Sequence, residues 1–449
     1  YRTWFDGMMT WLTGSGDVAI LNPDTGANVT IPSWKKVASE GEGQAARAKV
    51  EADRAKTEAD RAFTEADRVA GIVAAAALPL PDVWAPLSDS LRLLTGFGRD
   101  VLVGSDVVAR MVNFSRNSTV TYIGKDGQLK TAAANEPRFD KEGLPIEGQS
   151  QNIIPISNFP QNLASWAAPN QTGNLYSYVA APDGTSSAVK VSFAGDGFNQ
   201  PFPSLVVGTV YTFSFYAKNE TATDVNVSIM LGSGSGAGAV RIPANTAWTR
   251  YSVTRTFQAG DSTLRWYFST KNVEVSLWGT QLEALPFASS YIPTNGAAVT
   301  RAADMATLPQ SLNLGESQLG FSLAVEFDSV NPGSYRVLEL SDFSSILADG
   351  AAIIIRHAGK EVYGINAPLG QRHHIAYSVA ADGAITVALN GKVLAPQSRS
   401  AGAASSKTSI SLGNRWNGDN NRAIYGHLRD LKIWTKKPLT ADQLKVASA

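Results

Sequence analysis

The densest group of side chains able to bind a ligand lies between residues 415 and 422. It combines one aromatic ring, three amides, one carboxylate and two guanidinium groups, in Arg415, Trp416, Asn417, Asp419, Asn420, Asn421 and Arg422. A planar ring can stack on a sugar, while amides and guanidinium groups can hydrogen-bond hydroxyl or carboxylate groups. The loop therefore favours carbohydrate binding. The alternative is a solvated hairpin in which Trp416 packs on its own domain.

The same loop offers oxygen ligands for a metal ion. Asp419 with Asn417 or Asn420 would suit calcium, which prefers carboxylate and amide oxygens. We predict no metal site and no cofactor, and keep calcium at this loop as the open alternative.

Local motifs of common enzymes are absent from the chain. It contains no Gly-x-Ser-x-Gly, Walker or His-Glu-x-x-His motif and no cysteine. No cluster of carboxylates stands beside aromatic residues, although glycosidases need two carboxylates at the scissile bond. The repeat of a parallel β-helix is absent too. We therefore predict that the chain is not an enzyme, and expect a surface or inter-strand role for the pair His373-His374.

Charge and hydropathy restrict the partners. The 449 residues include 39 Lys and Arg against 39 Asp and Glu, so the formal net charge is zero and nothing favours nucleic acid as a partner. No apolar run reaches the roughly 18 to 20 residues that span a bilayer, so we expect no membrane-embedded segment. The absence of cysteine excludes disulfides and thiolate metal sites.

A seven-residue repeat lies in residues 51–71, where Glu-Ala-Asp-Arg recurs at 51, 58 and 65. Small apolar residues alternate at spacings of three and four, which is the seam of a coiled coil: Ala52, Ala55, Ala59, Ala62, Ala66, Val69 and Val73. We predict an Ala-rich coiled coil over residues 37–77, against the alternative of a lone solvated helix. An alanine seam buries little area and does not itself choose between two, three and four strands.

The first 36 residues form a separate module in this interpretation. Apolar residues recur at helical spacing in Trp4, Phe5, Met8 and Trp11, and a hairpin signal at Asp24-Thr25-Gly26 follows. About 36 residues cannot bury so many large apolar side chains alone. We therefore expect these residues to pack between copies of the chain, to dock onto another protein, or both.

Beyond Pro81 the pattern is β. Alternation of apolar and polar residues predicts a connector at 78–150, a jelly-roll domain at 151–293, a linker at 294–315 and a second sandwich at 316–449. Asn390-Gly391 is a hairpin signal, and Thr440 with Gln443 predicts a capped C-terminal helix. The expected fold class is mainly β, with an N-terminal α/β anchor and a coiled coil before two β-sandwiches.

Three groups of segments resemble known proteins. Phe114–Tyr122, Gly127–Phe139 and Ile146–Ile154 resemble a connector common in tail fibres of tailed bacteriophages. In such proteins segments similar to Trp278–Glu283, Phe287–Gly296 and Val299–Asp304 close a jelly roll like those of carbohydrate-binding modules. His373–Tyr377, Val387–Gly391 and Gly426–Trp434 resemble a laminin-G or concanavalin-like sandwich.

The resemblance implies a homotrimeric tail fibre located in the virion and assembled in the host cytoplasm. Trp4, Phe5, Met8 and Trp11 would then attach the fibre to other tail or baseplate proteins. The C-terminal sandwich would bind a host glycan or outer-membrane protein through the loop from Arg415 to Arg422. Two alternatives stay open: a polysaccharide depolymerase tailspike, and a structural tail or baseplate protein without a receptor.

Overall fold

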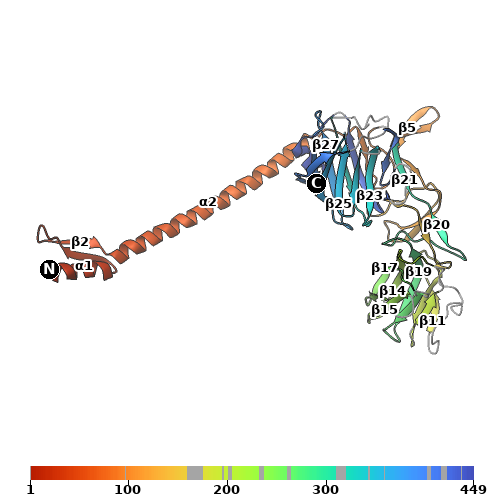
Figure 1. The fold of residues 1–449 in the computed structure, drawn as a ribbon, viewed down its shortest axis with the longest axis horizontal. Helices are drawn as coiled ribbons and strands as arrows, with labels where there is room; N and C mark the ends of the chain where they lie inside the picture. The colour runs from red at the N-terminus through yellow and green to blue at the C-terminus, as the bar shows by residue number, and fades with distance from the viewer. Residues whose placement is uncertain are drawn as a thin grey trace. The chain divides into compact units, whose positions relative to one another are not determined.

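The computed structural model describes residues 2–96, 98–158, 175–194, 197–200, 205–231, 237–259, 264–309, 320–341, 344–357, 359–401, 406–415, 422–435 and 437–449. The chain divides into two compact units, Tyr1–Ala76 and Ala77–Ala449, which are described separately. Strands dominate the second unit and helices the first (Figure 1). The expectation of a mainly β chain with N-terminal helices is therefore confirmed.

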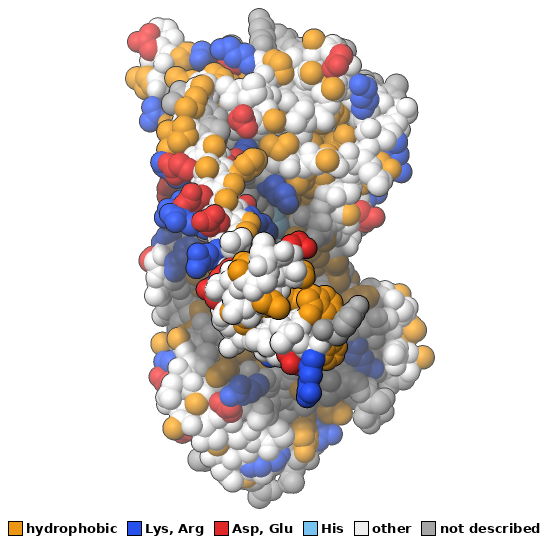
Figure 2. Space-filling view, turned by 90° about the vertical axis from the view of Figure 1, so that its left-hand side faces the viewer, with side chains coloured by type: hydrophobic (Ala, Val, Ile, Leu, Met, Phe, Trp, Pro, Cys, Tyr) orange, Lys and Arg blue, Asp and Glu red, His pale blue; other side chains and the backbone are white. Residues whose placement is uncertain are grey.

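The first unit begins with the predicted helix and hairpin. Helix α1 (Arg2–Thr13) precedes strands β1 (Asp17–Leu21) and β2 (Asn28–Pro32), and the indole of Trp11 donates to the carbonyl of Pro32 at 3.0 Å. Trp4 and Phe5 remain more than half exposed on this small module. Figure 2 shows apolar side chains on the surface of the module, which faces the viewer.

Helix α2 (Trp34–Ala76) carries the heptads. Ser33 caps it, since its side chain accepts from the backbone of Lys36, and 43 residues make a rod of about 65 Å. Arg68 pairs with Glu65, three residues before it, and Arg54 pairs with Glu58, four residues after it. All seven predicted seam residues are exposed on the single helix. The coiled coil and its trimeric state stay predictions.

The first β-sandwich forms within residues 175–283. One sheet has the order β11-β12-β19-β14-β17 and faces another with the order β13-β18-β15-β16. In the core between them, the ring of Trp266 makes edge-to-face contacts with Phe213 and Phe215. The strands are β11 (Leu175–Val179), β12 (Ala188–Ser192), β13 (Gly197–Gln200), β14 (Val210–Asn219), β15 (Val225–Leu231), β16 (Ala237–Ile242), β17 (Thr246–Thr256), β18 (Leu264–Phe268) and β19 (Glu274–Glu283).

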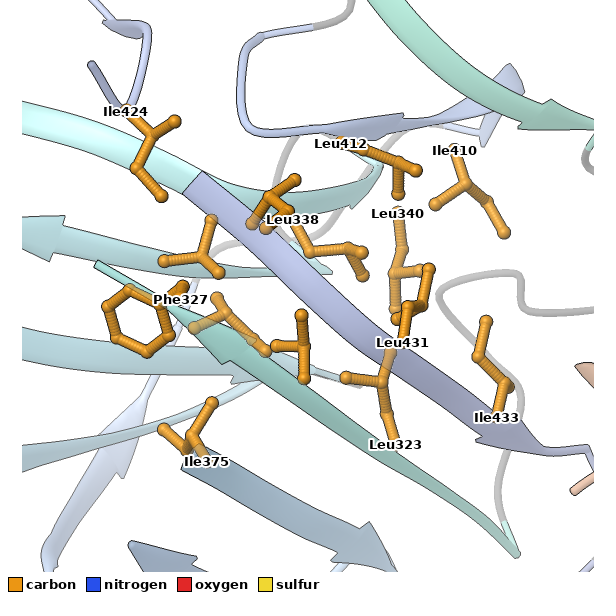
Figure 3. Close-up of a cluster of buried hydrophobic side chains, with 14 of the residues drawn as sticks. Leu323, Phe327, Leu338, Leu340, Ile375, Ile410, Leu412, Ile424, Leu431 and Ile433 are labelled. Atoms are coloured by element: carbon orange, nitrogen blue, oxygen red, sulfur yellow. The ribbon is translucent and has the colours of Figure 1, made fainter. Parts of the chain in front are cut away.

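The second sandwich packs two further sheets. The β23 sheet has the order β30-β26-β25-β24-β23-β31-β21-β6, and the β22 sheet has the order β29-β28-β27-β22-β32-β3. Leu323, Leu338 and Leu431 belong to the apolar core that these sheets share (Figure 3). The strands after the first sandwich are β20 (Val299–Arg301), β21 (Met305–Pro309), β22 (Phe321–Phe327), β23 (Ser334–Ser341), β24 (Ser344–Asp349), β25 (Ala352–His357), β26 (Lys360–Asn366), β27 (His373–Val379), β28 (Ile385–Leu389), β29 (Lys392–Val393), β30 (Gln397–Ser400), β31 (Ser406–Leu412) and β32 (Gly426–Trp434).

Strands from the expected connector complete this second sandwich. Strands β3 (Val83–Ala85) and β9 (Leu144–Ile146) pair with β32, and β6 (Asn113–Ser115) pairs with β21. Strand β10 (Ser150–Asn152) pairs with β20. The alternation of residues did not predict these long-range pairings. The domain boundaries themselves stay predictions.

Local signals in the second unit are confirmed. Asn390-Gly391 joins β28 to β29, as predicted. Strands β7 (Val120–Ile123) and β8 (Leu129–Ala132) form another hairpin, around Lys125-Asp126-Gly127. Helix α3 (Ala441–Ala447) starts at a capping box of Thr440 and Gln443. A further hairpin, β4 (Arg99–Val103) with β5 (Asp106–Met111), is largely exposed. No helix in the described part of the chain is long and apolar enough to cross a membrane.

Candidate functional site

The predicted sugar-binding loop falls mostly outside the described residues. Trp416, Asn417, Asp419, Asn420 and Asn421 belong to the part that is not described, so the structure does not place them. Arg415 follows β31 and Arg422 precedes β32, and both are half-buried. The loop as a binding site therefore stays a prediction, and so does calcium binding there.

A cleft of about 450 Å³ lies where the connector, the first sandwich and the second sandwich meet. The connector contributes Tyr122 and Asp140, and strand β17 contributes Trp248 and Arg250. The second sandwich contributes Asp328, just after β22, and His427, on β32. All six of these side chains are half-buried. The cleft thus brings aromatic rings and charged groups together from three parts of the sequence.

His427 lies between two carboxylates. Its Nδ1 is 2.9 Å from Asp328 Oδ2, and its Nε2 is 2.9 Å from Asp140 Oδ2. Burial of the ring opposes its charged form, but the hydrogen bonds and charges of Asp140 and Asp328 outweigh burial and raise the pKa of His427 to about 9. His427 is therefore a cation at neutral pH, and both ring N–H groups donate to the carboxylates.

The pKa of Asp140 shifts in the opposite direction to that of His427. Its burial favours the neutral acid, but the hydrogen bond and charge of His427 prevail and lower the pKa of Asp140. Gly426 permits the arrangement, because a Cβ at that position would lie 2.0 Å from the carbonyl oxygen of Asp328. The close approach of β32 to the end of β22 thus sets the Asp328–His427 pair.

The aromatic wall of the cleft comes from the first sandwich. Trp248 packs against a small buried cluster that includes Tyr216, Trp278 and Tyr291, which leaves the ring partly exposed toward the cleft. Arg250 lies over the ring of Tyr216 at 5.6 Å and donates to Ser214 Oγ at 2.8 Å. The wall therefore presents an indole beside a fixed guanidinium group.

A buried ion cluster supports the same cleft. Arg138 donates to Glu147 and Asp304, each at 2.7 Å, and Arg116 donates to Asp304 at 3.1 Å. Arg301 also pairs with Glu147. Arg138 reaches Ser290 Oγ at 2.7 Å, and Glu147 accepts from the backbone of Ser290 at 2.8 Å. The cluster thus fixes the segment around Ser290 that lines the cleft.

Sequence reasoning missed this site. Asp140, Asp328 and His427 share no local motif, and His427 lies 287 residues from Asp140. Trp266 and Trp278 of the first sandwich are buried, whereas Trp248 is half-buried at the cleft. No group of three or more His, Asp or Glu suited to a metal ion occurs among the described residues.

No protein-family model matches the chain, and no curated protein matches it significantly. Among solved structures, an enzymatically active domain of tailspike protein 4 of bacteriophage CBA120 is 16% identical, with a TM-score of 0.22 over 29% of this chain and 21% of that one. Domain 4 of AbnA, an extracellular arabinanase from Geobacillus stearothermophilus, is 16% identical, with a TM-score of 0.25 over 36% of this chain and 82% of that one.

A tandem of carbohydrate-binding modules from Xyn10C of Paenibacillus barcinonensis is 11% identical, with a TM-score of 0.24 over 64% of this chain and 98% of that one. Scores this low carry no argument about the activity of this chain.

The expectation that the chain is not an enzyme is dropped; the similar solved structures include an enzymatically active tailspike domain and a domain of an arabinanase. That expectation rested on the absence of local catalytic motifs from the sequence. Carboxylates that act on a glycosidic bond are brought together by folding and leave no fixed local motif. Missing motifs therefore could not exclude an activity, and the carboxylates of Asp140 and Asp328 meet only in the folded chain.

Proposed function

We propose that this chain is a bacteriophage tail protein that binds a host-surface glycan in the cleft between its connector and its two sandwiches. The observation that carries the proposal is that the partly exposed Trp248 and Arg250 line one cleft together with Asp140, Asp328 and His427. Sugar sites combine an apolar face with a few oriented polar groups that bond hydroxyls. The phage assignment rests on the sequence resemblance of the connector.

Replacing Trp248 by alanine is expected to weaken binding of host-surface polysaccharide about tenfold or more, because the sugar loses its stacking face. Tyr178→Ala is the matched control, since Tyr178 is 38% exposed on the first sandwich outside the cleft. Binding to host cells and to isolated polysaccharide would be measured by titration. Equal binding by both variants would move the glycan site elsewhere.

Cleavage of the bound glycan is the second candidate, favoured by Asp140 and Asp328 on opposite sides of His427. Asp140 is held as a carboxylate and could stabilise developing positive charge on the sugar. His427, a cation at neutral pH, could donate a proton once a substrate oxygen replaces one of its carboxylate partners. This candidate agrees with a tailspike that acts on polysaccharide.

The Asp140→Asn variant is expected to lose release of reducing ends from host polysaccharide while it keeps glycan binding, because the amide retains the size of the side chain without the charge that would stabilise the sugar. Reducing-end release by wild type and variant is the measurement. An intact wild type that releases nothing, or a variant as active as wild type, would reject cleavage in this cleft.

We further propose that the chain is a homotrimer with residues 1–36 toward the virion, where Trp4, Phe5, Met8 and Trp11 contact other tail or baseplate proteins. The exposed seam of α2 and the exposed apolar side chains of α1 support this arrangement. A glycan or an outer-membrane protein would be the partner on the host. Three linked sites would bind a repetitive surface more tightly than one site, through effective concentration.

Light scattering of the intact chain is expected to give three times the chain mass of 47.7 kDa. An Ala59→Asp variant should shift the mass toward monomer on dilution, because it places a charge in the seam. Lys56→Asp, on an exposed part of the same helix and outside the predicted seam, should leave the mass unchanged. A monomeric or dimeric wild type would contradict the trimer.

A further inference from the structure

A group of exposed apolar side chains surrounds the hairpin of β4 and β5 in the second unit. Its members are Leu94, Leu102, Val103, Val107 and Val108, and each of them is close to half exposed or more. Single exposed apolar residues are ordinary on a protein surface, but a group of neighbours marks an interaction surface. Figure 1 shows the hairpin, labelled at β5, projecting from the sheets of the second sandwich. A two-stranded hairpin gains stability when such residues find a packing partner.

The tip of the hairpin has a defined conformation. Gly104 and Ser105 form a two-residue turn, and Gly104 has a φ of +63°, which glycine adopts readily at the first position of such turns. Leu102 and Val103 end β4 at this turn, with 57% and 66% of their surfaces exposed. Asp106 begins β5 opposite Val103 and is exposed as well. The tip therefore presents two aliphatic side chains beside one carboxylate.

A groove of about 500 Å³ lies along the other strand of the hairpin. Val107 of β5 lines one side, and Leu93 and Leu94 of the segment before β4 line the other. The two sides separate because the backbone of Leu93 donates to the carbonyl of Arg110, whereas that of Leu94 donates to Trp84, each at 2.8 Å. The groove is thus a fork between two backbone segments with aliphatic walls.

The tip and the groove are different surfaces of the same hairpin. Neither Leu102 nor Val103 lines the groove of its own chain. A contact between two different surfaces of identical chains is head-to-tail, and a rotation axis closes such contacts into a ring. In a ring of three copies, the tip of each copy meets the groove of the next, so every tip and every groove is covered.

Charge favours a second copy over a lipid surface as the occupant of the groove and the partner of the tip. Insertion of the tip into a bilayer would bury the carboxylate of Asp106 without a counter-charge, which is costly. Arg92 and Arg99 are exposed and pair with Met111 from either side at the base of the hairpin, next to the groove. An aliphatic tip with one carboxylate thus matches an aliphatic groove with two guanidinium groups beside it.

We propose that the hairpin of β4 and β5 joins copies of this chain, with Leu102 and Val103 of one copy in the groove of the next. The proposal rests on the proposed homotrimer and adds to it a contact within the second unit, separate from the seam of α2. Burial of aliphatic surface from both sides supplies the free energy of this contact. The carboxylate of Asp106 faces Arg92 or Arg99 of the neighbouring copy.

The test uses thiols at the tip and in the groove, because the chain contains no cysteine of its own. Val103→Cys and Leu94→Cys are combined in the full chain, and the purified protein is treated with a short bifunctional maleimide. We expect covalent products of two and three chains on a denaturing gel, since each tip thiol lies beside the groove thiol of the next copy. Each substitution alone should give only single chains.

Val103→Cys combined with Val393→Cys is the matched control, because Val393 is an exposed valine of β29 outside the groove. It should give only single chains. Single chains from the variant with Val103→Cys and Leu94→Cys would overturn the proposal. Joined chains from Val103→Cys alone would do the same, since they place tip against tip. Light scattering separates the two proposals: a wild type of three chains without joined products loses only the hairpin contact, whereas a single-chain wild type loses the homotrimer as well.

A charge at the tip gives an independent measurement. Leu102→Asp is expected to make the trimer dissociate at a concentration about tenfold higher than wild type, because a carboxylate replaces aliphatic surface in the groove. Val393→Asp should leave the dissociation unchanged. Equal dissociation of both variants would contradict the contact. Binding of wild type, but not of Leu102→Asp, to phosphatidylcholine vesicles with an unchanged trimer would assign the tip to a lipid surface and overturn the proposal.

Discussion

The Arg138→Met variant is expected to lower the free energy of unfolding of residues 77–449 by about 3–5 kcal/mol. Arg138 is 1% exposed and donates to two buried carboxylates, Glu147 and Asp304. Burial of Glu147 favours its neutral form, but the charges of Arg301 and Arg138 outweigh burial. The pKa of Glu147 therefore lies far below its usual range. Without Arg138, two buried negative charges lose a shared partner.

The loss should extend beyond stability to the cleft. Arg138 also donates to Ser290 Oγ, and Glu147 accepts from the backbone of Ser290. Both contacts position the segment that lines the cleft. We therefore expect weaker glycan binding by Arg138→Met at temperatures where the variant is still folded.

Chemical denaturation of wild type and variant gives the change in free energy. Arg241→Met is the control, because the Arg241–Asp224 pair is exposed and such pairs contribute about 0–1 kcal/mol. If Arg138→Met costs no more than this control, the ion cluster does not stabilise the second unit as its burial suggests.

Local signals in the sequence predicted local structure. The hairpin at Asn390-Gly391 and the capping box of Thr440 with Gln443 each depend on residues within a few positions. Turn and cap chemistry is read directly from such neighbours. These elements were therefore predictable without knowledge of the rest of the chain.

Pairings between distant segments were not predictable in this way. Strand β3 pairs with β32 through Val83 and Ile433, and β9 pairs with the same strand through Leu144 and Leu428. A short apolar run contains no feature that indicates which strand, several hundred residues away, it pairs with. The sequence therefore predicted the connector as a separate segment, whereas in the structure its strands complete the second sandwich.

The cleft was missed for the same physical reason. Asp140 precedes a turn, Asp328 follows a strand, and His427 begins another strand. None of the three residues belongs to a recognisable motif in the sequence. Only in the folded chain do Asp140 and Asp328 contact His427 on β32 and stabilise its protonated form. The loop from Arg415 to Arg422 was noticed because its polar residues are consecutive in the sequence. Such a run describes local composition and does not show which residues are in contact in the folded chain.

The stability of the second unit is expected to fall by about 3 kcal/mol as the pH rises from 6 to above 9, through loss of the His427 proton. The folded pKa of His427 is about 9 against an ordinary value of 6.5. The proton therefore stabilises the fold fully below pH 6.5, and this stabilisation disappears as the pH rises through 9. Asp140 acts in the opposite sense, because its lowered pKa contributes stability above 3.8 that is lost in acid.

Denaturation of wild type and His427→Gln at pH 6 to 10 isolates the contribution, since other titrating groups are common to both. The difference in their unfolding free energy should be largest near pH 6 and shrink toward pH 10. His374→Gln, whose ring lies 3.5 Å from Glu326 on a more exposed face, should keep the wild-type profile. If the difference in unfolding free energy between wild type and His427→Gln does not change with pH, His427 is not a cation between Asp140 and Asp328.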